Sequence, residues 1–181
     1  MRPGPAHNDG MQTWDALRAR RNVRQFTEQA VAPNDIDQIL EAGRRAPSAG
    51  NWQPWDFVIV TDRATLTRLA GVWRGAGHVA GAAAAIGIVA PQPADDRQAR
   101  LLQYDLGQAT MALAIAAADL GLGTGHAAVE NQDLAREILG FPDDKFLAYL
   151  LSVGYPADRP LRVIVRPDRR PFAEVVHRER W

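Results

Sequence analysis

The chain has no cysteine among its 181 residues. Disulfide bonds, a thiol nucleophile, iron–sulfur ligation and thiolate zinc sites are therefore excluded, and any redox chemistry needs a bound organic cofactor. An excess of either charge is also absent, because 21 basic side chains balance 21 acidic ones. Without a net field to attract nucleic acid or an anionic membrane, we expect neither as a partner.

Long hydrophobic runs are absent as well. The longest apolar stretch, around residues 79–94, is rich in alanine, is interrupted by glycine and proline, and is too weak to span a bilayer. Residues 1–10 are polar, with two prolines and two glycines, so they form neither a signal peptide nor an anchor. We expect these residues to be disordered, residues 11–181 to form one domain, and the protein to be cytoplasmic.

Metal ligands and two common catalytic motifs are missing. The four histidines include no pair at metal-ligand spacing, so we expect no metal site. Residues 75–80 and 123–128 fit a loose dinucleotide fingerprint, but each follows a helical pattern and leads into strand-like residues, unlike a Rossmann loop. Ser48 is not in a Gly-x-Ser-x-Gly elbow and has no local histidine as its base, which disfavours a serine hydrolase.

Helix and strand patterns alternate along the domain. Apolar residues recur at helical spacing over 36–43 after Pro33, and over 66–73 after Asp62, a residue suited to cap a helix. Short apolar segments with little alternation are typical of strands covered on both faces; they are residues 57–60, 84–89 and 146–153. We therefore expect a sheet enclosed between helices.

Residues 98–120 form the longest helical pattern and are apolar on nearly every side, with seven alanines among them. A helix that is hydrophobic all round is buried. In a domain of this size, burying every face of so long a helix requires a second subunit over one of them. The pattern therefore favours a dimer.

Residues 44–55 have the composition of a shaped loop, and we call them the signature loop. Two arginines end a helix, and Pro47 stops it. Three uncharged side chains then suit the edge of a neutral ligand, namely Ser48, Asn51 and Gln53. Trp52 and Trp55 can wall such a site. The alternative interpretation is a capped turn packed under the two tryptophans.

Residues 20–24, Arg-Arg-Asn-Val-Arg, place three guanidiniums around a small amide at the end of the first helical segment. We call them the arginine run. Arginine meets a phosphate with a planar, bidentate fork, so the run suits a phosphate group. The alternative is a solvated charged face.

At this separation, the two clusters resemble the FMN-binding nitroreductase superfamily, in which an Arg-Arg-Ser-x-Arg-like run precedes Ala-Pro-Ser-x-x-Asn-x-Gln-Pro-Trp. The likeness extends to Gly-Leu-Gly-Thr at residues 121–124 and to the carboxyl end at residues 154–156, 169–171 and 175–181. It implies an α+β, three-layer fold with a central mixed or antiparallel sheet flanked by helices. It also implies a homodimer joined by the long buried helix, with FMN at each of two interfacial sites.

The resemblance assigns roles to individual residues. Arg20, Asn22 and Arg169 would hold the FMN phosphate, and Arg24 would stabilise negative charge at the pyrimidine end of the flavin. Arg21 is either a further contact or a surface group. From the partner subunit, the signature loop would reach the flavin through Pro47, Ser48, Ala49 and Asn51, and Gln53 is a further candidate of the same loop.

The family also supplies backbone groups and small side chains beside the reactive ring nitrogen, at the positions of His126, Ala127 and Ala128. Ordinary strand packing is the alternative for the two alanines, and a core histidine is the alternative for His126. Asn22 stands where the branch that makes dimethylbenzimidazole has an aspartate, and an amide cannot ionise, which argues against that activity. The region in which larger members place an asparagine and a lysine contains His78.

The expected function is two-electron transfer from NADH or NADPH to a small oxidised acceptor, such as a nitroaromatic or a quinone. A ping-pong route is expected, in which the flavin and no side chain does the chemistry. The alternatives are a specialised flavin reaction, such as dehalogenation or dehydrogenation, and a flavin-binding protein that serves storage or sensing without turnover. The acceptor stays open, as does the donor, for which a reduced deazaflavin is a third option.

Overall fold

The computed structural model describes residues 12–181, so the disorder expected for residues 1–10 lies outside the described part of the chain. The helices there are α1 (Thr13–Ala19), α2 (Pro33–Arg44), α3 (Arg63–Leu69), α4 (Asp96–Asp119), α5 (Gln132–Leu139) and α6 (Phe172–Val175). Single 3-10 turns lie at η1 (Ala49–Asn51), η2 (Ala70–Val72) and η3 (Gly77–Val79). The strands are β1 (Asp56–Val60), β2 (Ala84–Pro91), β3 (Gly123–Ala127) and β4 (Lys145–Gly154).

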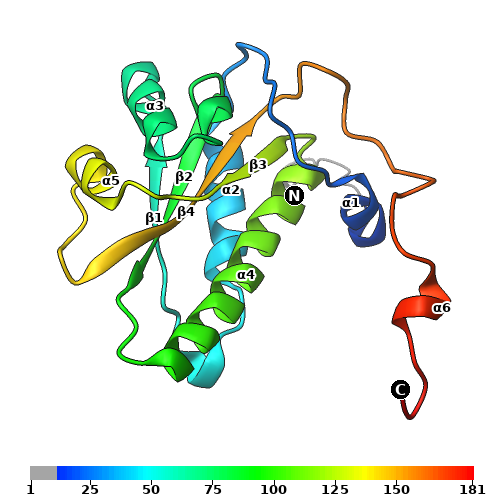
Figure 1. The fold of residues 1–181 in the computed structure, drawn as a ribbon. Coiled ribbons are helices and arrows are strands. Elements are labelled where there is room, and N and C mark those ends of the chain that lie inside the picture. The colour runs from blue at the N-terminus through cyan, green and yellow to red at the C-terminus, as the bar shows by residue number, and fades with distance from the viewer. Residues whose placement is uncertain (1–11) are drawn as a thin grey trace, which may run out of the picture.

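The strands form one sheet in the order β1-β2-β4-β3, and every neighbouring pair is antiparallel (Figure 1). β2 lies at the centre and is buried along nearly its whole length, as its unbroken apolar sequence predicts. The expected α+β class is confirmed, and the sheet of the described chain is antiparallel rather than mixed.

Helices cover both faces of the sheet and give the expected three layers (Figure 1). One core cluster joins α2 and α4 to the sheet through side chains such as Ile39 and Leu113. A second cluster joins α3 and α5 to the opposite face through Leu66 and Ala135. Gly43 lets α2 approach α4 closely, because a Cβ there would lie 2.6 Å from Leu113 Cδ2.

The expectation that residues 57–60 are covered on both faces is wrong. β1 is an edge strand, and Ile59 is 39% exposed. Short apolar strands have a similar pattern at the edge and at the centre of a sheet, so the pattern alone does not separate them. The helix expected over 66–73 is also too long, because α3 ends at Leu69 and the chain tightens into the η2 turn. Asp62 does cap α3, accepting from Thr65 N–H over 2.8 Å.

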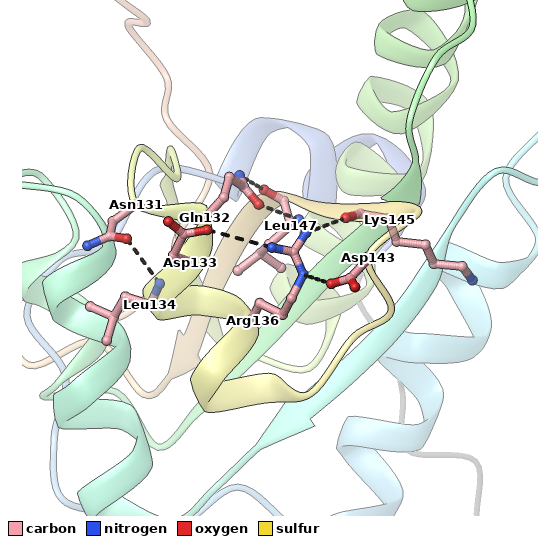
Figure 2. A network of polar contacts seen from close by, with 8 residues as sticks. All are labelled: Asn131, Gln132, Asp133, Leu134, Arg136, Asp143, Lys145 and Leu147. Carbon is pink, nitrogen blue, oxygen red and sulfur yellow. Dashed lines mark hydrogen bonds and ion pairs between the residues drawn. The ribbon is translucent and has the colours of Figure 1, made fainter.

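Polar contacts fix α5 to the neighbouring strand (Figure 2). Asn131 caps the helix by accepting from Leu134 N–H over 3.0 Å. Gln132 binds both backbone groups of Leu147, accepting from the N–H (3.0 Å) and donating to the carbonyl (2.9 Å). Arg136 adds a hydrogen bond to the Lys145 carbonyl, and ion pairs with Asp143 and Asp133. These contacts therefore fix α5 to the first half of β4.

α4 spans 24 residues. Its first turn is capped by Asp95, which accepts from Gln98 N–H over 2.7 Å. One side packs on α2 and the sheet, but the other exposes an apolar stripe at helical spacing. The members of this α4 stripe are Leu101 (38% exposed), Tyr104 (70%), Met111 (41%) and the half-buried Ile115.

The chain leaves the sheet after β4 and continues as an extended arm, residues 157–181, which runs past α1 and away from the body (Figure 1). Its side chains are mostly exposed, and they include large apolar ones such as Val165, Phe172 and Trp181. Within residues 12–181, none of the helices combines the length and the apolar character that a membrane crossing needs.

Candidate functional site

The arginine run lies beside β3. It leaves α1 in an extended conformation, forms a parallel bridge between Asn22 and Thr124, and donates from Val23 N–H to the Thr124 carbonyl over 2.8 Å. Val23 is buried, whereas Asn22 and Arg24 on either side of it are exposed. The buried valine therefore fixes the run against the sheet edge and turns its polar side chains outward.

The three guanidiniums of the run differ in what they contact. Arg21 binds the base of the arm, because its Nη2 donates to Asp158 Oδ1 (2.7 Å) and to the Arg159 carbonyl (2.8 Å). Arg20 and Arg24 have no carboxylate partner within the described part of the chain. Two cations without a counter-ion beside a sheet edge are suited to hold an anion.

Two half-buried histidines lie near these cations. Burial lowers the pKa of His126 in β3, and the charges of Arg20 and of His78 lower it further. Burial also lowers the pKa of His78 in η3; a hydrogen bond to the His126 carbonyl opposes this, and the charge of Arg24 adds to it. Both imidazoles are therefore biased toward the neutral form.

The two predicted alanines after His126 differ in exposure. Ala127, the last residue of β3, is buried in the cluster under α3 and α5, so its methyl group belongs to the core. Ala128 follows the strand and is exposed. The position of Ala127 agrees with the strand-packing interpretation of its side chain.

The signature loop adopts an unusual backbone conformation. α2 ends at Arg44, and Gly50, Asn51 and Gln53 then have φ angles of 58°, 58° and 54°. A positive φ is uncommon outside glycine and costs free energy unless the surroundings impose it. Ser48 contributes to this shape, because its hydroxyl accepts from Gln53 N–H over 2.8 Å.

A buried carboxylate that sequence reasoning missed anchors this loop. Asp105 in α4 is 1% exposed, and its Oδ2 accepts from Ala49 N–H over 3.0 Å. Gln108 Nε2 donates to Asp105 Oδ1 (3.3 Å) and to the Pro47 carbonyl (3.4 Å). No local pattern marks Asp105, because its partner is 56 residues away in the chain.

The predicted loop residues face outward. Pro47, Ala49, Asn51 and Gln53 are exposed, and Ser48 is half-buried. Of the two tryptophans expected to wall a site, Trp52 lines a hollow of about 300 Å³ together with Ala49 and Leu101. Trp55 is mostly buried in the core cluster, and its exposed part lines a different hollow of about 490 Å³, together with Gln53 and residues of α2 such as Leu40.

The arginine run and the signature loop lie at opposite ends of α4 (Figure 1). The loop is tied to Asp105, whereas the run lies beside β3, which begins shortly after Asp119 ends the helix. Asp105 and Asp119 are about 21 Å apart along a helix that rises 1.5 Å per residue. Arg169 is elsewhere again, exposed on the arm. A single chain therefore does not gather the predicted residues into one place.

The profile of the nitroreductase family matches residues 17–155, which include both the arginine run and the signature loop. The chain belongs to the nitroreductase family. The resemblance inferred from the two clusters is thus confirmed, and the fold is that of a family of oxidoreductases.

Individual nitroreductase relatives match along most of their length. A protein of Archaeoglobus fulgidus whose name pairs NADH dehydrogenase with NAD(P)H nitroreductase is 32% identical over 166 residues, covering 90% of this chain and 94% of that protein. A 5,6-dimethylbenzimidazole synthase of Rhodospirillum rubrum is 34% identical over 213 residues, covering 94% and 95%. A solved structure from Clostridium acetobutylicum, named for NADH oxidase, has a TM-score of 0.81 at 27% identity and covers 92% of this chain and 100% of that one.

The nitroreductase family implies an FMN cofactor, and the donor sets of this chain fit that molecule. The unpaired cations Arg20 and Arg24 suit its phosphate and an electron-rich ring edge. The exposed amide groups of the signature loop and its half-buried Ser48 hydroxyl suit the polar edge of the flavin.

Proposed function

We propose that this nitroreductase is an FMN-dependent oxidoreductase that passes electrons from NADH or NADPH to a small oxidised acceptor. We further propose that it works as a homodimer with two interfacial sites. The observation that carries the proposal is the separation of the two clusters along α4. Each is half of a cofactor site, and a second copy of the chain brings the loop of one subunit to the arginines of the other.

The flavin, when bound, supplies the electron transfer. The residues of the chain hold and orient it. Arg20 and Asn22 bind the phosphate, together with Arg169 from the arm, and Arg24 places a positive charge at the pyrimidine end. Arg21 sets the reach of Arg169, because it fixes the base of the arm through Asp158. The partner loop contributes Pro47, Ser48, Ala49, Asn51 and Gln53.

The α4 stripe supports the homodimer. Leu101, Tyr104, Met111 and Ile115 recur at intervals of three, seven and four residues, the spacing of a helix that packs along another helix. The arm adds exposed apolar groups, such as Phe172 and Trp181, that extend beyond the body of their own chain. Both features are suited to lie against a second copy, as in obligate interfaces.

The names of relatives support the donor and the class of acceptor. Besides the Archaeoglobus protein, an FMN reductase [NAD(P)H] of Bacillus subtilis is 27% identical over 92% of this chain. The chain offers little material for a lid, because only residues 92–95 separate β2 from α4. A short connection of this kind leaves the hollow beside Trp52 open, which favours small planar acceptors such as nitroaromatics and quinones.

A second candidate is synthesis of dimethylbenzimidazole, which is favoured by the near full-length match to the Rhodospirillum enzyme. Asn22 disfavours it, because an amide beside the cofactor cannot exchange a proton as a carboxylate does. Incubation of the protein with reduced FMN under air, followed by product analysis, separates the two functions. Release of dimethylbenzimidazole would replace the proposed oxidoreductase activity.

The main experiment combines colour, turnover and a matched pair of variants. The purified protein should be yellow with flavin absorption and should oxidise NADH or NADPH steadily once a nitroaromatic or a quinone is added. Flavin without turnover would indicate a storage or sensing protein.

Arg169→Ala should weaken FMN binding roughly ten- to a hundredfold, because a charge-assisted hydrogen bond contributes about 1.5–3 kcal/mol.

Arg170→Ala is the matched control, because Arg170 pairs with Glu174 on the arm itself. Riboflavin lacks the phosphate, so its binding should respond to neither variant. Equal losses from Arg169→Ala and Arg170→Ala would contradict the assignment of Arg169. A loss shared by FMN and riboflavin would mean that Arg169 acts through packing of the arm.

A further inference from the structure

A buried serine and a histidine form a hydrogen-bonded pair beside the arginine run. His78 Nδ1 lies 2.8 Å from Ser152 Oγ, and His78 Nε2 lies 3.3 Å from the His126 carbonyl oxygen. Ser152 Oγ is also 3.2 Å from the Gly125 carbonyl oxygen. η3, β3 and β4 therefore meet in three polar links, and the side chains of His78 and Ser152 have no part in holding FMN as proposed above.

The three links are one hydrogen short when His78 is neutral. A neutral imidazole carries one N–H and the serine one O–H, so two hydrogens serve three contacts. If the hydroxyl donates to His78, the Gly125 carbonyl is left out. If it donates to Gly125, then His78 must donate from Nδ1, and its bare Nε2 faces the His126 carbonyl. Protonated His78 completes all three links at once.

The surroundings oppose that proton. Burial lowers the pKa of half-buried His78, and the charged Arg24 of the arginine run lowers it further. His126 lies nearby on β3, and the charge of His78 in turn lowers the pKa of His126. Arg63 of α3 donates to the carbonyl of Ala80, two residues further along the chain. No carboxylate within the described residues pairs with His78. Hydrogen bonding thus favours protonated His78, whereas burial and the nearby positive charge favour neutral His78.

The cluster is packed tightly against the arginine run. A Cβ on Gly125 would lie 2.4 Å from the Val23 carbonyl oxygen, 2.9 Å from Ser152 Oγ and 3.1 Å from His78 Cε1. The run, the serine and the histidine therefore converge on one glycine. A change in the charge held by the run is consequently felt at His78 across a short, partly buried distance.

We propose that an anionic group bound at the arginine run drives protonation of His78, and that the Ser152 hydroxyl turns from His78 to the Gly125 carbonyl as this happens. The inference rests on the proposed function, in which the anion is the FMN phosphate held by Arg20 and Asn22. The anion offsets the arginine charge that disfavours a proton on His78. The additional hydrogen bond that protonated His78 makes then favours the protonated form. Because binding linkage is reciprocal, FMN affinity should rise as pH falls toward 6.

Calorimetry measures the proton directly. FMN is titrated into the apoprotein at pH 6.5 in two buffers of different ionisation enthalpy, for the wild type and for His78→Gln. The phosphate itself loses some proton when it binds arginine, since its second pKa is about 6, and subtraction of the variant removes this contribution. The wild type should take up a measurable fraction of a proton more per site than His78→Gln, because only the wild type has an imidazole at this position. At pH 8.5 the difference should disappear.

Further variants, two other ligands and NMR sharpen the test. Ser152→Ala should reduce the uptake, because His78 Nδ1–H loses its acceptor, while His177→Gln, a histidine exposed on the arm, should leave it unchanged. Riboflavin binding should cause no uptake, and inorganic phosphate should cause a similar uptake to FMN. Ring-nitrogen NMR shifts of His78 should move toward the imidazolium values when FMN is added at pH 6.5.

The outcomes distinguish this inference from the function on which it rests. FMN binding with equal proton exchange in the wild type and in His78→Gln overturns the inference and leaves the proposed function in place. Uptake with riboflavin equal to that with FMN also overturns it, because the phosphate would then not be the cause. No binding of FMN or of phosphate overturns both.

Discussion

Similar side chains of the arginine run have different roles, and only the fold separates them. Arg20, Arg21 and Arg24 are equivalent candidates in the sequence. Arg21 is bound by Asp158, 137 residues away, whereas the other two keep their charges beside two histidines. The type of ligand could be predicted from the residues, but the division of labour depends on long-range contacts that no local pattern records.

Asp105 is the clearest residue that sequence reasoning could not find. Its single buried carboxylate holds Ala49 N–H and thereby part of a strained loop. Asp105→Ala should speed hydrogen exchange at the Ala49 amide and weaken FMN binding, at a cost in stability of about 1.5–3 kcal/mol, because the hydrogen bond is made to a charged group.

Asp119→Ala on the same helix is the control for Asp105→Ala, since Asp119 makes no hydrogen bond to the loop and lies at the far end of α4. In Asp119→Ala, hydrogen exchange at the Ala49 amide and the affinity for FMN should both be unchanged. Unaltered exchange at Ala49 in Asp105→Ala would show that the loop keeps its shape without α4.

The two half-buried histidines set the pH dependence of the apoprotein. The pKa values of His78 and His126 are lowered in the folded state from 6.5 in the unfolded chain. The unfolded state therefore binds more protons, so the free energy of unfolding should fall as pH decreases through 6.5 and level off above about 7.5.

Urea denaturation between pH 5.5 and 8 measures this dependence. The double variant with His78→Gln and His126→Gln should show a flatter curve over that window. Stability that rises on acidification would contradict the assigned direction. With FMN bound, the free energy of unfolding should begin to fall only at lower pH, because the bound anion favours protonated His78 in the folded state.

At the scale of elements, the buried parts of the fold follow the sequence pattern most closely. The sequence predicted the start of α2 at Pro33, the helix cap at Asp62 and the buried strand β2 from its continuous apolar run. β3 was not among the predicted strands, because Gly-Thr-Gly-His-Ala has little β-branched or aromatic character, although strand packing was an alternative for Ala127 at its end. Its strand form comes from pairing with β4 and from the arginine run beside it.

α4 is the element on which association depends. Tyr104→Glu combined with Met111→Glu places two charges on the exposed stripe, and these should not be tolerated at an apolar interface. Sedimentation should then show monomers at micromolar concentration, and FMN retention should be lost with the dimer although neither residue belongs to the proposed site.

Gln103→Glu is the matched control on α4. It adds one charge beside the stripe and keeps the acceptor that binds the Tyr149 hydroxyl. The control should remain dimeric and yellow. A flavin-loaded monomer of the doubly charged variant would contradict the interfacial site.

At the scale of the whole molecule, the two halves of the proposed site belong to different subunits, and this can be tested by mixing. Arg20→Ala with Arg24→Ala damages one half, and Ser48→Ala with Asn51→Ala damages the other. Each variant alone should bind little FMN, because both of its sites lack one half.

Unfolding and refolding the two variants together should restore about a quarter of the FMN capacity. Half of the randomly paired dimers are mixed, and each mixed dimer of a two-fold assembly has one intact site and one doubly damaged site. Capacity no greater than that of the separate variants would mean that run and loop serve the same site from the same chain, or not at all.

The open edge of β1 has a consequence for how the protein fails when it is heated. Its outer backbone groups are without a strand partner among the described residues, and Ile59 is 39% exposed on the same strand. Such an edge is a template for pairing with other chains. Loss of the native assembly should therefore end in aggregates rather than in recoverable protein, so that the useful measure of durability is a half-life at a given concentration instead of a melting temperature.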